Sequence, residues 1–382
     1  MPKNLIVFLS LFLILYGLSN FYVGLRSWQA FRSIWPLAPV FYWLLYGFLA
    51  LAFLLGRFFE KHLPFVVSHI LTIIGSYWLA ALYYLLLIII VLDMLRLLDR
   101  VISFIPSTVK QAPTAVGLSV LIFTAGLLGY GIWNARHPII QHYDIVIPKS
   151  AGSLSQLHIV MISDIHLGKI VDLQRLEKLI DTVNELQPDI ILLPGDTIDE
   201  DVDLFEEQQM PAVFLRLHPI YGTYAVLGNH EYIGGKPDLA IQSLKQGGVI
   251  ALRDSSAEIA GSLYIVGRDD KSIVRTGKRR KKLVQIMKDL DPAHPVIVLD
   301  HQPSDLQEAA EAGIDLQLSG HTHLGQMFPN NLITHKVFEV DWGYLQKGPL
   351  QVIVSCGFGT WGPPIRIGNK PEIVDINITF RE

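Results

Sequence analysis

The sequence predicts an N-terminal all-α transmembrane bundle of four helices, followed by an α/β domain. The bundle is predicted from four stretches that lack Asp, Glu, Lys and Arg: Leu5–Leu25, Ile34–Gly56, Leu63–Leu92 and Ala112–Trp133. Each is long enough to cross a hydrocarbon core of ~30 Å as a helix. The α/β domain is predicted because, after Leu157, apolar strand-like runs alternate with helical stretches, among them Leu173–Leu186, Asp203–Leu217, Pro237–Gln246, Lys278–Leu290 and Ser304–Ala312. We therefore expect a bundle at 1–135, a linker with a first strand at 136–156, and a second domain at 157–382.

The composition agrees with a membrane protein. The 382 residues are 51% hydrophobic and only 17% charged, which is more apolar than an ordinary soluble chain. A formal net charge of −4 disfavours broad binding to nucleic acid. Cys356 is the only cysteine, which excludes an intrachain disulfide and a cysteine-rich zinc site. We expect a multi-pass protein of the cell membrane with membrane lipids as neighbours and no nucleic-acid partner.

The side of the membrane that carries the second domain is left open by the charges. Four spans place both chain ends on one side, and five cations then flank each side. The cations on the side of the chain ends are Lys3, Arg57, Lys61, Arg136 and Lys149. Those on the opposite side are Arg26, Arg32, Arg96, Arg100 and Lys110. The third span is longer than a bilayer needs, so we expect it either to tilt or to continue as a helix through Asp93–Arg100.

Five predicted buried strands in the second domain are each followed by Asp, Asn or His. The strands are His158–Ile162, Asp189–Leu193, Thr223–Leu227, Val296–Leu299 and Asp315–Leu318. The residues that follow them are Asp164 and His166, Asp196 and Asp199, Asn229 and His230, Asp300 and His301, and His321 and His323. Because α/β sheets bind ligands at the carboxyl ends of their strands, these side chains are expected to meet. Taken alone, Asn229 is equally a turn residue.

The donor types in this set are typical of a centre for two metal ions. Nitrogen and oxygen donors without thiolates suit Mn, Zn or Fe, and the sequence does not choose among them. Two such ions need a bridging carboxylate and a bridging hydroxide. With Asp164 and Asp196 as the only anionic ligands, the centre keeps a charge of about +1 and attracts an anion such as phosphate. This charge favours phosphoryl chemistry.

The order of the motifs resembles the calcineurin-like metallophosphoesterase superfamily. Asp-x-His, Gly-Asp-x-x-Asp, Gly-Asn-His-Glu, a single His and Gly-His-x-His occur in sequence, and the resemblance extends from about Tyr143 to Glu382. The segments from Gly320 to Gln326 and from Gly357 to Arg366 resemble its membrane-anchored bacterial branch. Some relatives in that branch hydrolyse UDP-2,3-diacylglucosamine, and others are general phosphodiesterases. The four-span part carries no such resemblance.

The resemblance implies a four-layer αββα sandwich with the site at one edge of its two sheets. It implies three ligands for a first ion: Asp164, His166 and His323. It implies three ligands for a second ion: Asn229, His301 and His321. Asp196 would bridge the two ions. His230, oriented by Asp199, would stand beside the leaving group while a bridging hydroxide attacks phosphorus.

One departure from the family leaves the phosphate-binding group open. The protein phosphatases of the superfamily carry an arginine after the second Asp of Gly-Asp-x-x-Asp, where this chain has Glu200. The metals alone or Arg268 are the candidates for that role. The basic run Lys278–Lys282 is either a solvated helix start or a contact for anionic headgroups. The segment Phe328–Gly348 is either a lid over the site or part of the core.

We therefore expect a metal-dependent hydrolase of phosphate esters or pyrophosphates at the membrane, acting on a phosphorylated small molecule or a lipid. An alternative is a non-catalytic scaffold, and another is a regulatory sensor domain on a membrane bundle. Retention of all seven candidate ligands and of the His230–Asp199 pair favours the enzyme.

Overall fold

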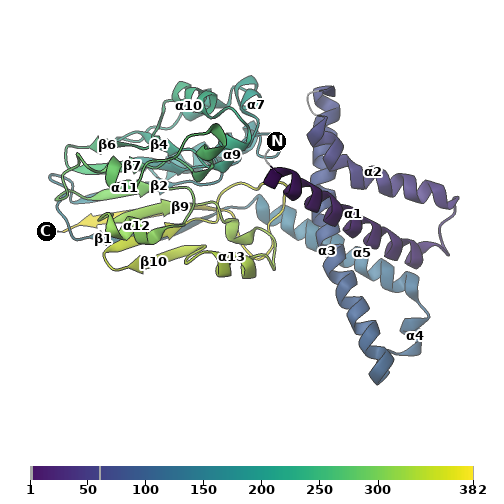
Figure 1. The fold of residues 1–382 in the computed structure, drawn as a ribbon. Helices are drawn as coiled ribbons and strands as arrows, with labels where there is room; N and C mark the ends of the chain where they lie inside the picture. The colour runs from purple at the N-terminus through teal and green to yellow at the C-terminus, as the bar shows by residue number, and fades with distance from the viewer. Residues whose placement is uncertain (1–2, 60–61, 382) are drawn as a thin grey trace. The chain divides into compact units, whose positions relative to one another are not determined.

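The computed structural model describes residues 3–59 and 62–381, and the chain forms two compact units. The helical unit contains residues 1–132 and 362–364, and the α/β unit contains residues 133–361 and 365–382 (Figure 1). The helices of the first unit are α1 (Lys3–Phe31), α2 (Pro39–Phe58), α3 (Phe65–Ile102), α4 (Ser107–Lys110) and α5 (Pro113–Ala135).

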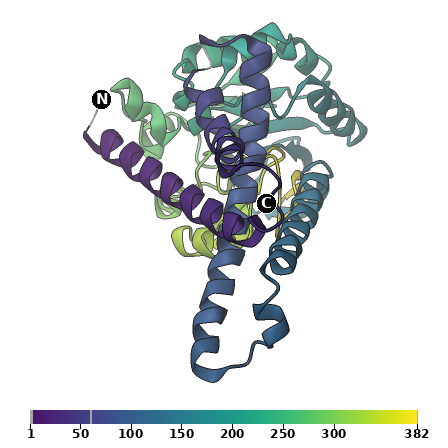
Figure 2. The same cartoon turned by 90° about the vertical axis from the view of Figure 1, so that its right-hand side faces the viewer.

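Three helices, α2, α3 and α5, are long and apolar enough to cross a membrane. They overlap three of the four predicted spans, which are Ile34–Gly56, Leu63–Leu92 and Ala112–Trp133. The first predicted span, Leu5–Leu25, lies within α1 and stays a prediction. Helix α3 has 38 residues and includes Asp93–Arg100, so the predicted helical continuation of the third span is confirmed. Figure 2 shows α5 beside the C-terminal half of α3.

The helical unit is held together by polar contacts as well as by apolar packing. Asn20 of α1 accepts a hydrogen bond from Trp78 Nε1 at 3.0 Å through its side chain, and its carbonyl accepts one from Tyr46 at 2.8 Å. Such interhelical hydrogen bonds contribute about 0.6–2 kcal/mol each in a bilayer. Helices α2 and α3 approach closely at Gly75, where a Cβ atom would lie 2.3 Å from the backbone nitrogen of Phe53. These contacts fix one particular packing of α1, α2 and α3.

The α/β unit contains two six-stranded sheets (Figure 1). In spatial order the first consists of β1 (Ile139–Ile147), β12 (Glu372–Phe380), β2 (Gln156–Met161), β3 (Ile190–Pro194), β4 (Thr223–Val226) and β5 (Val249–Ala251). The second consists of β10 (Gly343–Lys347), β11 (Leu350–Val354), β9 (Leu316–Ser319), β8 (Val296–Leu299), β7 (Leu263–Gly267) and β6 (Ser255–Ile259). Strands β2, β3 and β4 are parallel, and so are β7, β8, β9 and β11. Parallel pairing brings their carboxyl ends to one edge of each sheet.

Short helices connect the strands. They are α6 (Leu173–Glu185), α7 (Val202–Glu207), α8 (Met210–Phe214), α9 (Asn229–Ile233), α10 (Pro237–Gln246), η2 (Lys271–Thr276), α11 (Leu283–Ile286), α12 (Leu306–Glu311), η3 (His323–Gly325) and α13 (Asn331–Val337). One buried apolar core joins side chains of both sheets, such as Ile159 and Ile297. A second core joins α6, α8 and α10 to the first sheet. A third joins α11 and α12 to the second sheet.

The predicted strands agree with the structure within one or two residues, except the first. The first strand is predicted at Tyr143–Ile147 within the linker; β1 begins earlier, at Ile139, and pairs with β12 along its whole length. The predicted helices Leu173–Leu186 and Pro237–Gln246 correspond to α6 and α10. The predicted helix Asp203–Leu217 is divided into α7 and α8 because Gln209 has a positive φ of 54°.

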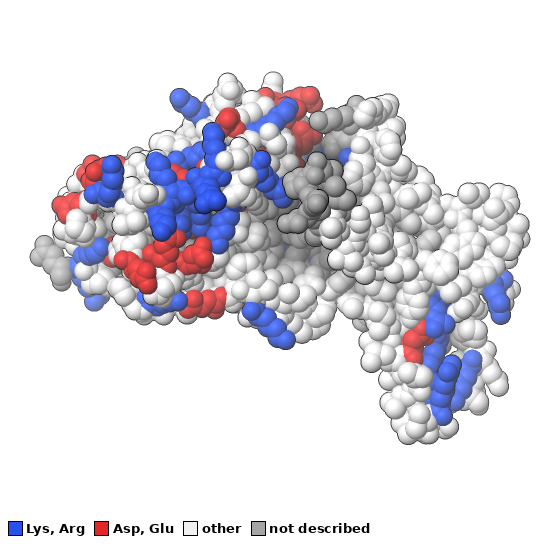
Figure 3. Space-filling view, in the orientation of Figure 1, with Lys and Arg blue, Asp and Glu red and all other residues white. Residues whose placement is uncertain are grey.

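The predicted helix Lys278–Leu290 is wrong for most of its length, since only α11 forms within it. Its N-terminal residues are bound individually instead: Arg280 donates to Asp300 Oδ1 at 3.0 Å, and the Lys281 backbone N–H donates to Asp254 Oδ2 at 2.7 Å. The other side chains of the basic run are exposed, and Figure 3 shows Lys and Arg side chains gathered on one face of the α/β unit. Contact of this run with anionic headgroups stays a prediction.

Gly75 provides a test of the packing between α2 and α3. Gly75→Ala places a methyl group against the Phe53 backbone, which cannot move aside as a flexible side chain can. We expect a loss of about 1–3 kcal/mol of stability, measured by thermal unfolding of the full chain in detergent. Gly47→Ala in α2 is the matched control, because no atom lies within 4 Å of its added Cβ. If Gly75→Ala lost no more stability than Gly47→Ala, the close approach of α2 and α3 would be contradicted.

Candidate metal centre

Backbone hydrogen bonds join four of the five loops that follow the predicted strands, in two pairs. The loops after β2 and β3 run side by side, because Asp164 N–H donates to Gly195 O at 3.1 Å and His166 N–H donates to Asp196 O at 3.0 Å. The loops after β8 and β9 are joined by Gly320 N–H, which donates to His301 O at 2.9 Å. The polar side chains that end these strands therefore start from fixed backbone positions.

Buried carboxylates connect further loops. Asp164 accepts hydrogen bonds from the His321 backbone N–H at 3.0 Å, so the loops after β2 and β9 are held together. Asp196 Oδ1 accepts one from the His230 backbone N–H at 2.9 Å, which joins the loops after β3 and β4. Glu231 supports the same junction by accepting from Ile198 N–H at 3.0 Å and from Gly228 N–H at 2.8 Å. Four strand ends from two sheets are bound in this way.

Two motif glycines are required by these close approaches. A Cβ atom at Gly320 would lie 2.1 Å from Asp164 Oδ2, and one at Gly228 would lie 2.1 Å from Asp196 Oδ1. Real Cβ atoms do not come so close to other atoms. Glycine at both positions lets the backbone N–H groups reach the carboxylates.

Backbone strain is concentrated among the predicted ligands. Five of the seven have positive φ values: Asp164 (52°), His166 (52°), Asp196 (50°), His321 (73°) and His323 (50°). The left-handed region costs about 1 kcal/mol or more for each non-glycine residue. Such strain persists where the surrounding structure holds it, and it gathers at functional sites.

A first group of donors consists of Asp164, His166 and His323. All three side chains are buried, and their donor atoms lie within 4.8 Å of one another. His323 Nε2 lies 3.3 Å from Asp164 Oδ1 and 3.1 Å from His166 Nε2. Two ring nitrogens and one carboxylate oxygen thus face a common point.

A second group consists of Asp196, His301 and His321. His301 Nδ1 lies 2.9 Å from the carbonyl oxygen of Pro194, so this nitrogen carries the proton and donates it. The opposite nitrogen, Nε2, lies 3.1 Å from Asp196 Oδ2 and 3.2 Å from Asn229 Oδ1. Burial lowers the pKa of His301, but the carboxylate of Asp196 outweighs it and raises that pKa well above the ordinary value, so this place favours a positive charge beside Nε2. A cation satisfies this arrangement, so the residues present fit divalent metal ions.

His230 and Asp199 form a pair next to these groups. His230 Nδ1 lies 2.8 Å from Asp199 Oδ1, so the other ring nitrogen is available to a substrate. Burial lowers the pKa of His230, but the carboxylates of Asp196 and Asp199 outweigh it and raise that pKa to about 9. His166, Asp199 and His230 also form a third cluster of possible metal donors.

The charges of the centre depend on one another. Burial raises the pKa of Asp164 and of Asp196, but His323 beside Asp164 and His301 beside Asp196 outweigh it, and both pKa values fall below the ordinary aspartate value. Burial dominates at His323 and lowers its pKa to about 4. Glu231 differs: burial, followed by the charge of Asp196, raises its pKa to about 7.

A cavity of about 510 Å³ opens above the donors. Asp196, Asn229, His230, His321 and His323 line one part of it. An apolar part is lined by Ile233, Ile333, Phe338 and Trp361. Ile333 and Phe338 belong to the segment Phe328–Gly348, so this segment borders the site, as the lid hypothesis expects.

The structure corrects one candidate and adds three residues. Arg268 is not a phosphate-binding candidate, because it is buried in contacts with Asp300 at 3.3 Å and Glu308 at 2.5 Å. Trp361 and Glu231 were given no role by the sequence, although Glu231 belongs to the Gly-Asn-His-Glu motif. Arg366 also was not expected at the centre; it is fully buried, and its Nη2 lies 3.2 Å from His323 Nδ1. The sequence held one signal for this position: Arg366 is the one charged residue in the segment from Gly357 to Arg366.

Comparisons with known proteins agree on one family. Residues 157–325 match the profile of the calcineurin-like phosphoesterase family. An uncharacterized metallophosphoesterase of Aquifex aeolicus (strain VF5) is 35% identical over 261 residues, which cover 67% of this chain and 98% of that protein. A transmembrane protein with metallophosphoesterase domain from Danio rerio is 31% identical over 268 residues, which cover 67% of this chain and 61% of that protein.

The chain therefore belongs to the calcineurin-like metallophosphoesterase family. Membership indicates a phosphoester hydrolase that uses divalent metals, and the structure contains groups of residues that can bind such metals. The three apolar helices and the relatives named as transmembrane proteins indicate association with a membrane.

Gly195 tests whether His301 belongs to a metal centre. A Cβ atom at Gly195 would lie 2.6 Å from His301 Nδ1, so Gly195→Ala displaces that ring. We expect affinity for Mn²⁺ to fall by about tenfold or more, as for other changes that reorient a ligand. The measurement is a metal titration of the full chain, followed by elemental analysis.

Gly313→Ala is the matched control for this experiment. Gly313 also has a positive φ, 76°, but no atom lies within 4 Å of its added Cβ. Both variants therefore place an alanine at a positive φ, which is 92° at Gly195 and 76° at Gly313. Equal Mn²⁺ affinity in the two variants would show that His301 does not bind metal.

Proposed function

We propose that this protein is a membrane-anchored, metal-dependent hydrolase of phosphate esters or pyrophosphates. The observation that carries the proposal is the convergence of seven nitrogen and oxygen donors, from five strand ends in two sheets, beneath an open cavity. A non-catalytic scaffold has no need for buried carboxylates, strained ligand backbones and a separate His–Asp pair at one place.

The donors divide into two sets for two divalent ions. Asp164, His166 and His323 form the set for the first. Asn229, His301 and His321 form the set for the second, and Asp196 lies near donors of both sets, with Oδ2 at 3.8 Å from His166 Nε2 and 3.1 Å from His301 Nε2. When bound, two such ions supply the Lewis acidity that activates a water molecule and neutralises phosphate charge. Mn, Zn and Fe all suit these donors.

The protein's own residues hold the substrate and move the proton. His230 borders the cavity, and Asp199 fixes its Nδ1, so Nε2 is the atom that donates a proton to the departing oxygen. Glu200 follows Asp199 where a family arginine would grip phosphate, and Arg268 is engaged elsewhere. Phosphate binding therefore falls to the ions and to the side chains that line the cavity.

The apolar wall of the cavity favours a substrate with an apolar portion. Ile333 on α13 is 62% exposed and Trp361 is 51% exposed, although both line the cavity. Exposed apolar side chains beside a polar centre are typical of a ligand-binding groove. We propose a lipid-linked phosphate ester as the substrate.

The proposed architecture is a four-span bundle, at 1–135, joined through 136–156 to a four-layer αββα sandwich. The three separate cores support the four layers, because one core lies between the sheets and each sheet has its own helices. The span Leu5–Leu25 within α1 supports a fourth crossing and a multi-pass protein of the cell membrane.

Asp196 tests the metal-dependent mechanism. Asp196→Asn removes half of the anionic ligand charge, and metal activation is worth several kcal/mol. We expect hydrolysis of bis(4-nitrophenyl) phosphate to fall more than about 100-fold, and chelation of the unchanged protein with EDTA to abolish it. Full activity of Asp196→Asn in EDTA would refute the mechanism.

His230→Gln is the comparison variant, since it keeps every proposed ligand. It is expected to bind metal as the unchanged protein does. Its turnover should fall by about 10²–10⁴ for alkyl phosphate esters, whose leaving group needs a proton. A smaller loss of turnover is expected for nitrophenyl esters, because their leaving group does not need a proton.

Ile333 tests the apolar part of the substrate. Ile333→Asp puts a charge into the apolar wall, so we expect KM for a diacyl phospholipid to rise by about tenfold, while kcat stays constant. The KM for bis(4-nitrophenyl) phosphate should not change. Leu332→Asp is the matched control, because Leu332 is also exposed on α13 but does not line the cavity. The same KM change for both substrates would contradict the lipid-linked substrate.

A further inference from the structure

Three cations gather at one end of the helical unit. Arg26 lies near the end of α1, Arg96 near the end of α3, and Lys110 at the end of α4 before α5 begins. The C-terminal end of α1 lies beside the N-terminal end of α5, because Thr114 Oγ1 donates to Ala30 O at 2.8 Å. Each cation lies within a few residues of an uncharged span, so all three lie at the depth of lipid headgroups.

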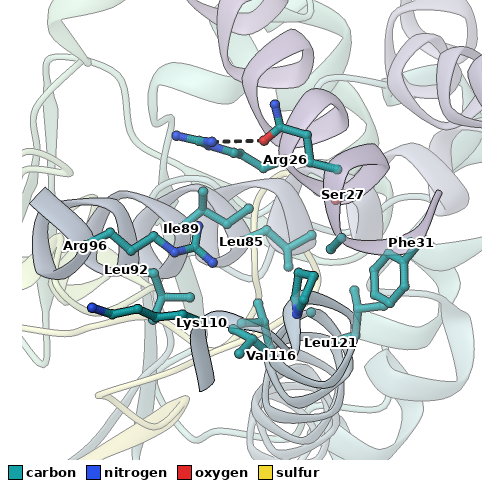
Figure 4. A pocket seen from close by; sticks show the side chains of 15 residues that line it. Arg26, Ser27, Phe31, Leu85, Ile89, Leu92, Arg96, Lys110, Val116 and Leu121 are labelled. Atoms are coloured by element: carbon teal, nitrogen blue, oxygen red, sulfur yellow. Dashed lines mark hydrogen bonds between the residues drawn. The ribbon is translucent and has the colours of Figure 1, made fainter. Parts of the chain in front are cut away.

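A cavity of about 280 Å³ lies between α1, α3 and α5 at this end, and we call it the headgroup crevice. In Figure 4 the charged side chains of Arg26, Arg96 and Lys110 lie on one side of it. Phe31 and Leu121 lie on the other side. Figure 3 shows the same end of the unit as a group of Lys and Arg around a smaller acidic area.

The positive charges of the crevice exceed its negative charges. Arg26 and Arg96 share one carboxylate, Asp93, and Lys110 pairs with Asp99 at 2.5 Å. Three cations thus face two carboxylates. The crevice therefore has one positive charge left for a ligand.

An apolar groove continues from the crevice. It has a volume of about 450 Å³, runs between α3 and α5, and shares Leu92, Val116 and Val120 with the crevice. Other residues along it are Ile88, Ala115 and Phe123. Phe123 is 61% exposed, so the groove opens outward where the bilayer would lie. A polar anion alone would leave this groove without an occupant.

We propose that the crevice and the groove bind one anionic glycerophospholipid. Its phosphodiester lies among Arg26, Arg96 and Lys110, and one acyl chain lies along α3 and α5. A phosphodiester carries the single negative charge that the crevice lacks. This site depends on the membrane embedding of the helices and not on the phosphoesterase reaction.

The test measures lipid binding to the full chain in a neutral detergent by native mass spectrometry. We expect dioleoylphosphatidylglycerol to bind at least fivefold more tightly than dioleoylphosphatidylcholine, since an interfacial cation contributes about fivefold to binding of an anionic lipid. The double variant Arg96→Gln with Lys110→Gln should lose about 25-fold of the affinity for phosphatidylglycerol. Both side chains are about half exposed, so the fold tolerates their replacement.

Arg32→Gln with Arg100→Gln is the matched control, because both arginines are exposed at the same end and do not line the crevice. This double variant should bind phosphatidylglycerol as tightly as the unchanged protein does. Val120 lines both the crevice and the groove, and Val120→Trp fills that place without changing any charge. This variant should bind phosphatidylglycerol more weakly, but it should bind glycerol phosphate as before. Equal binding of the two lipids to the unchanged protein, or equal losses in the two double variants, would overturn the proposal.

Discussion

Two carboxylates that are buried side by side constrain the whole α/β unit. Asp164 is fully buried and Asp196 is 2% exposed. An unpaired buried carboxylate costs several kcal/mol, so both need cations or N–H donors. The backbone donors come from His321 and His230, which follow strands of different sheets. Asp164 follows a strand of the first sheet and His321 follows a strand of the second, so the two sheets must bring their strand ends together before Asp164 is compensated. This requirement positions the imidazole of His321 as well.

Much of this centre was predictable because its signals are local. A buried parallel strand has a recognisable pattern, and its carboxyl end is where ligands bind, so Asp164, Asp196 and His301 could be expected near one another. The two-residue spacing in Gly-His-x-His likewise predicted that His321 and His323 would lie close together. That spacing alone does not say which donors share a group. The structure places His323 with Asp164, and His321 with Asp196.

Other features depend on partners that are distant in sequence, and no local pattern could predict them. Arg268 resembled a free cation after a strand, but its partner Glu308 is 40 residues away. The segment Lys278–Leu290 has a helical pattern. However, Arg280 is bound by Asp300, and Lys281 is bound by Asp254. Arg366 contacts His323 across 43 residues and also donates to the carbonyls of Gly357 and Gly359. A buried guanidinium with these partners holds the C-terminal segment beneath the centre.

The helical unit has more internal specificity than a tether requires. Hydrophobic length alone anchors a protein, and any apolar helix supplies it. Here Asn20 bonds to α2 and α3, and Tyr22 donates to Asp93 at 2.5 Å while Arg26 pairs with the same carboxylate. Polar groups in a membrane segment are costly unless they are paired, so such pairs select one arrangement of helices. That arrangement gives the cations at the ends of α1 and α3 fixed positions, which a binding site needs and an anchor does not.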